Sequence, residues 1–232
     1  MCHGLVFGSM ATWYFTAAAK LAERFEVILY DQRGHGKSGM AASGYDISTL
    51  ACDLDCLVRH CQDREAEAAE QVALVGHSYG ALVALEFALY HPGKVSKLVL
   101  VDAPLPAGHY VFPSMSHIDS PEALDASIPE EIRQKSMRGS RSAGKLRERM
   151  EFLFLKSTLP EDVRLSGDIA DDRLRQLEIP VLCLYGKNSD CLAAGQRLVN
   201  VLPHARLSLL DCGHYIPLEA PQEMTKLLDE FL

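Results

Sequence analysis

The residues at positions 76–80, which read Gly-His-Ser-Tyr-Gly, form the pattern in this sequence best suited to chemistry. They follow an apolar run at residues 72–75 and precede a helical pattern at residues 81–90. A serine on a sharp turn between a strand and a helix presents its hydroxyl to a substrate, and the flanking glycines avoid collisions with nearby backbone. The pattern therefore predicts that Ser78 is a nucleophile, although the same spacing also occurs at ordinary strand-to-helix turns.

A nucleophilic serine needs a general base and an acid that orients the base. His214 is the best candidate base, because it lies in a loop just after the apolar run at residues 205–210. Asp190 follows residues 179–185, a second apolar run that predicts a buried strand. We interpret Ser78, His214 and Asp190 as a catalytic triad, with each member just beyond an apolar run.

These segments resemble the α/β-hydrolase family, whose triad occurs in the chain order serine, acid, histidine. His3-Gly4 resembles the family's His-Gly oxyanion loop, and residues 31–38 (Asp-Gln-Arg-Gly-His-Gly-Lys-Ser) resemble its D-x-R-G-x-G-x-S turn. The resemblance runs from His3 to the C-terminus with a variable middle. It implies a mostly parallel sheet flanked by helices, and an oxyanion hole formed by the backbone N–H groups of Leu5 and Tyr79.

The acid is the first departure from the family pattern. Asp190 lies four residues after Gly186, whereas the family's acid commonly lies three after the equivalent glycine, where this chain has Ser189. Asp102 is the alternative acid, since some family members place theirs after the earlier strand. The acid must reach Nδ1 of the histidine, and we expect Asp190 to do so from a loop that is one residue longer.

The beginning of the chain is the second departure. The family's sheet begins with two antiparallel strands and a buried parallel strand that leads into His-Gly, yet only Met1 and Cys2 precede His3. We expect these N-terminal strands to be missing through truncation rather than rearrangement. A central strand would then lack a neighbour for its backbone groups, and the protein could be unstable or poorly active.

Length and patterning indicate a single α/β domain. The 232 residues are 48% hydrophobic, which is enough for a sizeable core. A helix near residues 14–24, a strand at 27–30 and a helix at 47–61 precede the serine turn, and this alternation predicts a parallel sheet covered on both faces. We assign residues 1–102 and 179–232 to the hydrolase core, and residues 103–178 to a helical lid that controls substrate entry.

Charge and cysteine content limit the partners. The formal charge of −8 and the lack of a binding motif argue against nucleic acid. Residues 133–149 nevertheless contain seven basic side chains against one acid, which would suit an acidic acyl carrier protein or a coenzyme A ester, or would simply form a solvated surface. No apolar run suggests a membrane span or signal peptide, so we expect a cytoplasmic protein with reduced cysteines and no metal.

These observations predict a serine hydrolase that cleaves a small-molecule carboxylic ester or thioester through an acyl-enzyme, without a cofactor. Acyl transfer and hydrolysis of a carbon–carbon bond use the same triad and remain alternatives. A ligand receptor or inactive enzyme that retains the three residues is an alternative of another class, and so is an inactive truncated fragment. Serine at the nucleophile position argues against dehalogenase or epoxide hydrolase chemistry, for which related folds use aspartate.

Overall fold

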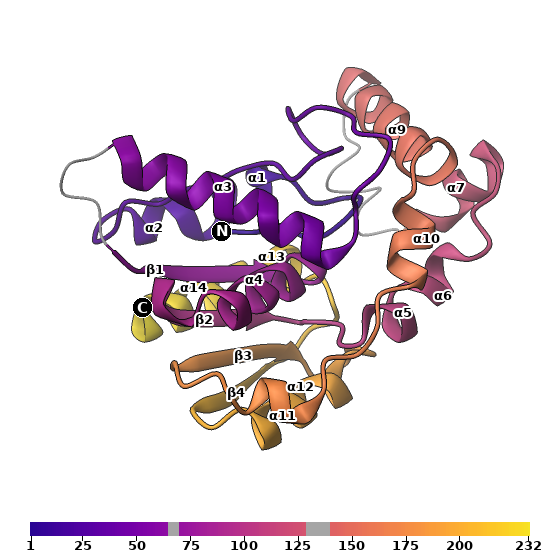
Figure 1. The fold of residues 1–232 in the computed structure, drawn as a ribbon. Helices are drawn as coiled ribbons and strands as arrows, with labels where there is room; N and C mark the ends of the chain where they lie inside the picture. The colour runs from indigo at the N-terminus through magenta and orange to yellow at the C-terminus, as the bar shows by residue number, and fades with distance from the viewer. Residues whose placement is uncertain (65–69, 129–139) are drawn as a thin grey trace.

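A parallel sheet of four strands forms the centre of the molecule in the computed structural model, which describes residues 1–64, 70–128 and 140–232. The strands are β1 (Val72–His77), β2 (Val95–Val101), β3 (Val181–Gly186) and β4 (Ala205–Leu210), and they lie side by side in that order (Figure 1). All three pairings are parallel. The carboxyl ends of the strands therefore meet at one edge of the sheet.

Helices connect the strands and surround the sheet. Those that precede β2 are α1 (Met10–Trp13), the π-helix η1 (Tyr14–Ala18), α2 (Ala19–Leu21), α3 (Ile47–Arg64), α4 (Tyr79–Tyr90) and the 3-10 helix η2 (Pro92–Lys94). Those that follow β2 are α5 (Ala107–Tyr110), α6 (Phe112–Met115), α7 (Pro121–Ser127), α9 (Ser140–Leu155), α10 (Leu159–Arg164), α11 (Asp171–Leu174), α12 (Leu192–Val201), α13 (Ile216–Glu219) and α14 (Pro221–Phe231). The helix predicted at residues 47–61 is confirmed as α3.

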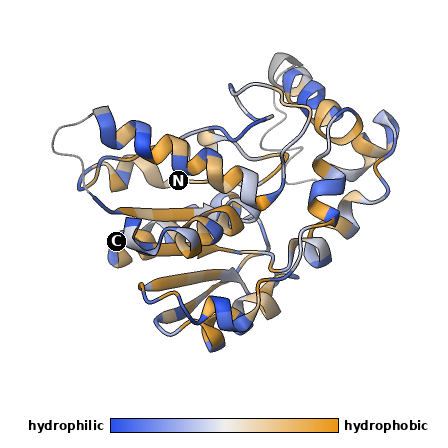
Figure 2. Ribbon diagram, viewed as in Figure 1, coloured by the Kyte–Doolittle hydropathy of each residue, from blue (hydrophilic) through white to orange (hydrophobic). Residues whose placement is uncertain are grey.

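Two apolar cores lie on opposite faces of the sheet. Side chains alternate between the faces of a strand, so that Leu98 and Leu100 pack with α3, α4 and α12, whereas Val99 and Val101 pack with η1 and α14. Figure 2 accordingly shows the strands as mostly hydrophobic, with hydrophilic residues on the outer sides of the helices. Burial on both faces explains why residues 98–101 form a continuous apolar run rather than an alternating one.

The segment predicted to be a lid is helical but not uniform. Helices α5, α6, α7, α9 and α10 gather on one side of the sheet in Figure 1. In contrast, α11 lies against α12, where Arg197 forms ion pairs with Asp168 and Asp171. Residues 168–174 therefore pack on the body, and we propose that a lid, if these helices form one, ends before Asp168.

The first two residues lie beside β1. The Cys2 N–H donates to the Val75 carbonyl at 2.7 Å, and the Cys2 carbonyl accepts from the His77 N–H at 3.0 Å. On their other side, the Met1 ammonium donates to the Ile28 carbonyl at 2.8 Å. The prediction of a strand at residues 27–30 is wrong, because these residues form no regular strand in the structure. Their bond to Met1 does not continue into a ladder of backbone hydrogen bonds.

Within residues 1–64, 70–128 and 140–232, none of the helices combines the length and the apolar character that crossing a membrane requires.

Candidate active site

The turn at Ser78 has the strained backbone that the sequence predicts. Ser78 follows β1 directly, with φ of 54° and ψ of −128°, which is a sparsely populated conformation for a residue with a side chain. The glycines at both ends of the pentapeptide are required sterically. A Cβ on Gly76 would lie 2.3 Å from the Gly80 carbonyl oxygen, and one on Gly80 would lie 2.3 Å from the His3 carbonyl oxygen.

The imidazole of His214 lies between the Ser78 hydroxyl and a carboxylate, and bonds to both. Its Nε2 lies 2.9 Å from the Ser78 Oγ, and its Nδ1 lies 2.6 Å from Asp102 Oδ2. Since Nδ1 donates to the carboxylate, Nε2 is left to accept the serine proton. Ser78, Asp102 and His214 follow β1, β2 and β4 respectively, so the parallel sheet brings together side chains that are far apart in the sequence.

The prediction that Asp190 orients the histidine is wrong: Asp102, the alternative, has that position. Asp102 is fully buried, and its Oδ1 accepts the Gly186 N–H at 2.9 Å. It lies at the end of β2 with φ of 49°, a left-handed conformation that aspartate tolerates better than most residues. Asp190 instead lies in the β3–α12 loop with an exposed side chain.

The loop that carries His214 is held by two side chains that the sequence did not single out for this role. Glu219 accepts the N–H groups of Gly213 at 2.8 Å and Tyr215 at 3.0 Å, on either side of the histidine. His77 Nε2 lies 3.0 Å from the His214 carbonyl oxygen, to which it donates. These three bonds fix the backbone around the imidazole.

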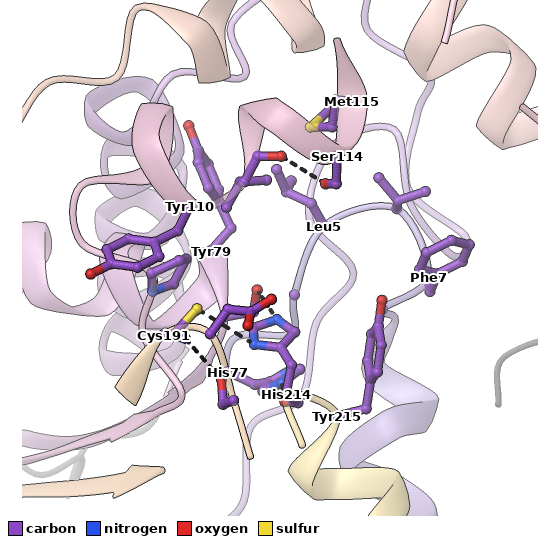
Figure 3. A pocket seen from close by; sticks show the side chains of 18 of the residues that line it. Leu5, Phe7, His77, Tyr79, Tyr110, Ser114, Met115, Cys191, His214 and Tyr215 are labelled. Carbon is purple, nitrogen blue, oxygen red and sulfur yellow. Dashed lines mark hydrogen bonds between the residues drawn. The ribbon is translucent and has the colours of Figure 1, made fainter. Parts of the chain in front are cut away.

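An apolar cavity of about 350 Å³ opens beside Ser78 (Figure 3). Its wall includes Leu5 and Tyr79, the residues predicted to supply oxyanion N–H groups. The other apolar lining comes mostly from the helices after β2 and from the loop after β4, and consists of Phe7, Tyr110, Val111, Met115, Ile118, Met150, Phe154, Tyr215 and Leu218. The cavity can therefore hold a mainly apolar group next to the serine hydroxyl.

A sequence profile of the alpha/beta hydrolase family matches residues 1–227. The chain belongs to this family. The parallel sheet of this α/β-hydrolase, the tight turn at residues 76–80 (the elbow) and the position of His214 after the last strand agree with the resemblance seen in the sequence.

Individual relatives agree with the family assignment. RutD of Variovorax paradoxus, which is named as a carbamate hydrolase, is 42% identical over 97 residues, or 41% of this chain and 34% of its own length. The match thus spans about a third of that curated relative. Among solved structures, Est816, described as an N-acyl homoserine lactone degrading enzyme, has a TM-score of 0.74 at 25% identity and covers 100% of this chain and 91% of its own.

The fold of a second solved structure is equally similar. The enol-lactonase from Burkholderia xenovorans has a TM-score of 0.75 at 20% identity, and the match covers 99% of this chain and 88% of the enol-lactonase. At this identity the likeness concerns the fold alone.

Three atoms that could bind a metal ion lie within 4.8 Å of one another in the described part of the chain. They belong to Asp102, Cys191 and His214. Two of them already bond to each other in the triad. Burial raises the pKa of the Cys191 thiol to about 12, so the sulfur is protonated at neutral pH. The donor set therefore fits a triad better than a metal centre.

Two neutral histidines hold the loop of residues 3–6 in this hydrolase. His35 Nε2 accepts the Val6 N–H at 2.7 Å, and His3 Nε2 accepts the Gln32 N–H at 2.9 Å. Each ring donates from its Nδ1 to a backbone carbonyl. Because a protonated ring could not accept these bonds, the loop beside Ser78 depends on both histidines remaining uncharged.

We expect the free energy of unfolding to fall as the pH drops from 6.5 toward 4. Burial lowers the pKa of His3 to about 3 and that of His35 and His77 to about 4. Between these values and the ordinary value of 6.5, the unfolded chain binds protons that the folded chain does not, so acid favours unfolding. The slope approaches roughly 1.4 kcal/mol per pH unit for each histidine.

Urea unfolding at several pH values measures this loss. His35→Gln, whose amide also offers an acceptor, should be less stable than wild type at pH 7.5 but should have a shallower slope below pH 6.5. An equal slope in the two proteins would show that His35 does not take part.

Proposed function

We propose that this protein is a serine hydrolase that cleaves neutral carboxylic esters, including lactones, or thioesters through an acyl-enzyme intermediate. The observation that carries the proposal is the bonded series from Ser78 Oγ to His214 Nε2 at 2.9 Å and from His214 Nδ1 to Asp102 at 2.6 Å, facing the apolar cavity. This is the arrangement in which a serine hydroxyl becomes a nucleophile.

The first half-reaction forms the acyl-enzyme. His214 takes the proton from Ser78 as the hydroxyl oxygen attacks the carbonyl carbon, and Asp102 stabilises the resulting imidazolium. The backbone N–H groups of Leu5 and Tyr79 donate to the oxyanion of the tetrahedral intermediate. The intermediate collapses when His214 returns the proton to the leaving alcohol or thiol, which leaves the acyl group on Ser78.

Water releases the acyl group in the second half-reaction. His214 removes a proton from water as its oxygen attacks the acyl carbonyl, and then returns that proton to the Ser78 oxygen. No step of this sequence requires a cofactor. A competing alcohol or amine in place of water would give acyl transfer.

The lining of the cavity favours an uncharged substrate. Among the described residues that line it, Asp190 is the one that carries a carboxylate, and no lysine or arginine is present. An anionic acyl group would therefore meet an acidic mouth and an apolar wall without a compensating cation. Esters and lactones with an apolar acyl chain fit this surface, and the lactone-degrading activity ascribed to Est816 is consistent with it.

The basic segment gives little support for an acidic carrier protein. Residues 129–139 and the side chains of residues 140–142 lie outside the described part of the structure. Of the remaining basic side chains, Arg147 pairs with Asp125 at 2.8 Å, and Arg149 donates to the carbonyls of Gly34 and Ser38. The carrier protein stays a prediction, and we propose a free small molecule as the substrate.

Covalent labelling by a fluorophosphonate probe tests the proposal without knowledge of the substrate. We expect wild-type protein to be labelled, and Ser78→Ala and His214→Ala to lose labelling while they remain folded by circular dichroism. Labelling should then be followed by turnover of p-nitrophenyl esters, acyl lactones and acyl thioesters. A folded wild-type protein that does not react with the probe would rule out the proposed function. Labelling without turnover of any ester would favour a receptor or inactive enzyme.

A further inference from the structure

We propose that Ser189 is a positioning residue for the triad, in addition to the three residues that carry the proton transfer. This inference rests on the proposed function. The Ser189 hydroxyl donates to Asp102 Oδ2 at 2.5 Å. That is the same oxygen that accepts from His214 Nδ1 at 2.6 Å. Ser189 and the imidazole therefore share one carboxylate oxygen.

The bond from Ser189 is fixed from the other side. The Cys191 N–H donates to the Ser189 Oγ at 3.1 Å, which leaves the hydroxyl proton free to point at Asp102. The carboxylate of Asp102 is fully buried and Ser189 is largely so, which limits competition from water for the bond between them. With Gly186 N–H on Oδ1, the carboxylate of Asp102 is bound at both oxygens before it meets the histidine.

Two consequences follow for the chemistry. The hydroxyl fixes the plane of the carboxylate, and hence the direction of the bond to His214. It also withdraws negative charge from Oδ2, because a hydrogen bond to the charged form of an acid stabilises that charge. Asp102 consequently stabilises a protonated His214 less than an unshared carboxylate would. Ser189 thus orients the histidine and moderates the charge of the carboxylate that faces it.

The pH dependence of labelling separates these effects from a structural role. In Ser189→Ala we expect the rate of fluorophosphonate labelling above pH 8 to fall roughly three- to tenfold, about the value of one ordinary intramolecular hydrogen bond. The acidic inflection of the rate against pH should move to higher pH, because the carboxylate then holds the imidazolium more strongly. Ser189→Thr retains a hydroxyl and should restore both the rate and the inflection.

The other ionisable groups around Asp102 and His214 are the same in wild type and variant, so a shift between them reports the hydroxyl. These groups are His77, Tyr185, Asp190, Cys191, Asp211, Cys212, Tyr215 and Glu219.

Ser38→Ala is the matched control. Its hydroxyl donates to the Asp31 carbonyl at 2.6 Å, away from the triad. We expect this variant to lose stability without moving the inflection.

The outcomes distinguish this inference from the proposed function. An unchanged inflection in a folded Ser189→Ala that is still labelled would overturn the positioning role and leave the hydrolase proposal intact. A shift in Ser189→Ala that is matched by Ser38→Ala would also overturn it. If wild-type protein is not labelled at any pH, both proposals fail, because a positioning residue requires a reactive Ser78.

Discussion

Replacement of Asp102 by asparagine should reduce kcat on any ester substrate by about 10⁴-fold, because the amide stabilises the wrong tautomer of the histidine. In wild type the carboxylate accepts the Nδ1 proton and leaves Nε2 free for Ser78. The side-chain amide of the Asp102→Asn variant would offer an N–H to Nδ1 instead, which places the imidazole proton on Nε2. The serine would then face a donor rather than a base.

The fold should tolerate this substitution. Asparagine accepts the left-handed backbone conformation of position 102, and the amide oxygen can still accept from the Gly186 N–H. Steady-state kinetics together with circular dichroism measure the two properties separately. Loss of folding would make the rate uninformative, so a melting temperature close to that of wild type is part of the expected result.

Asp190→Asn is the decisive comparison. Its exposed charge at the mouth of the cavity is screened by water and salt, so we expect a change on the order of two- to threefold for a neutral ester. A loss of about 10⁴-fold in Asp190→Asn, with Asp102→Asn nearly active, would reverse the assignment of the acid made from the geometry.

Gly76→Ala should destabilise the fold by roughly 3 kcal/mol or more, since the added methyl has no space. Its Cβ would lie 2.3 Å from the Gly80 carbonyl oxygen and 2.5 Å from the Ala81 Cα. Both are backbone atoms at the start of α4, which cannot move without shifting the elbow. For a chain of this size we expect the melting temperature to fall by roughly 6 to 12 °C, as measured by calorimetry.

A second glycine provides a control at which alanine should not lower the melting temperature. Gly144 lies in α9, and a Cβ there would meet nothing within 4 Å. Alanine favours a helix over glycine by about 1 kcal/mol, so Gly144→Ala should leave the melting temperature unchanged or raise it. Equal melting temperatures for the two variants would contradict the steric account of the elbow.

Local sequence was enough to predict the nucleophile, since the elbow is built from five consecutive residues. The strain at Ser78 and the need for small neighbours are properties of a single tight turn, and the apolar run before it predicted β1. His214 was predictable for a related reason, because a loop after a late parallel strand lies at the same sheet edge as the elbow. The extent of the proposed lid was less predictable. Helix α11 lies inside the predicted segment but packs on α12, where Arg197 pairs with Asp171.

Only the tertiary structure decided the acid. Asp102 and Asp190 both follow buried strands, and no property of either segment shows which carboxylate faces Nδ1 of the histidine. The pairing of β2 with β3 places Gly186 and Ser189 at the carboxylate of Asp102, where each donates a hydrogen bond, and Asp102 Oδ2 also accepts from His214. Sequence by itself therefore determined the family, and it predicted the proposed nucleophile Ser78 and the proposed base His214. The choice of acid depended on strand register and on hydrogen bonds between residues more than 80 positions apart, which only the folded chain brings together.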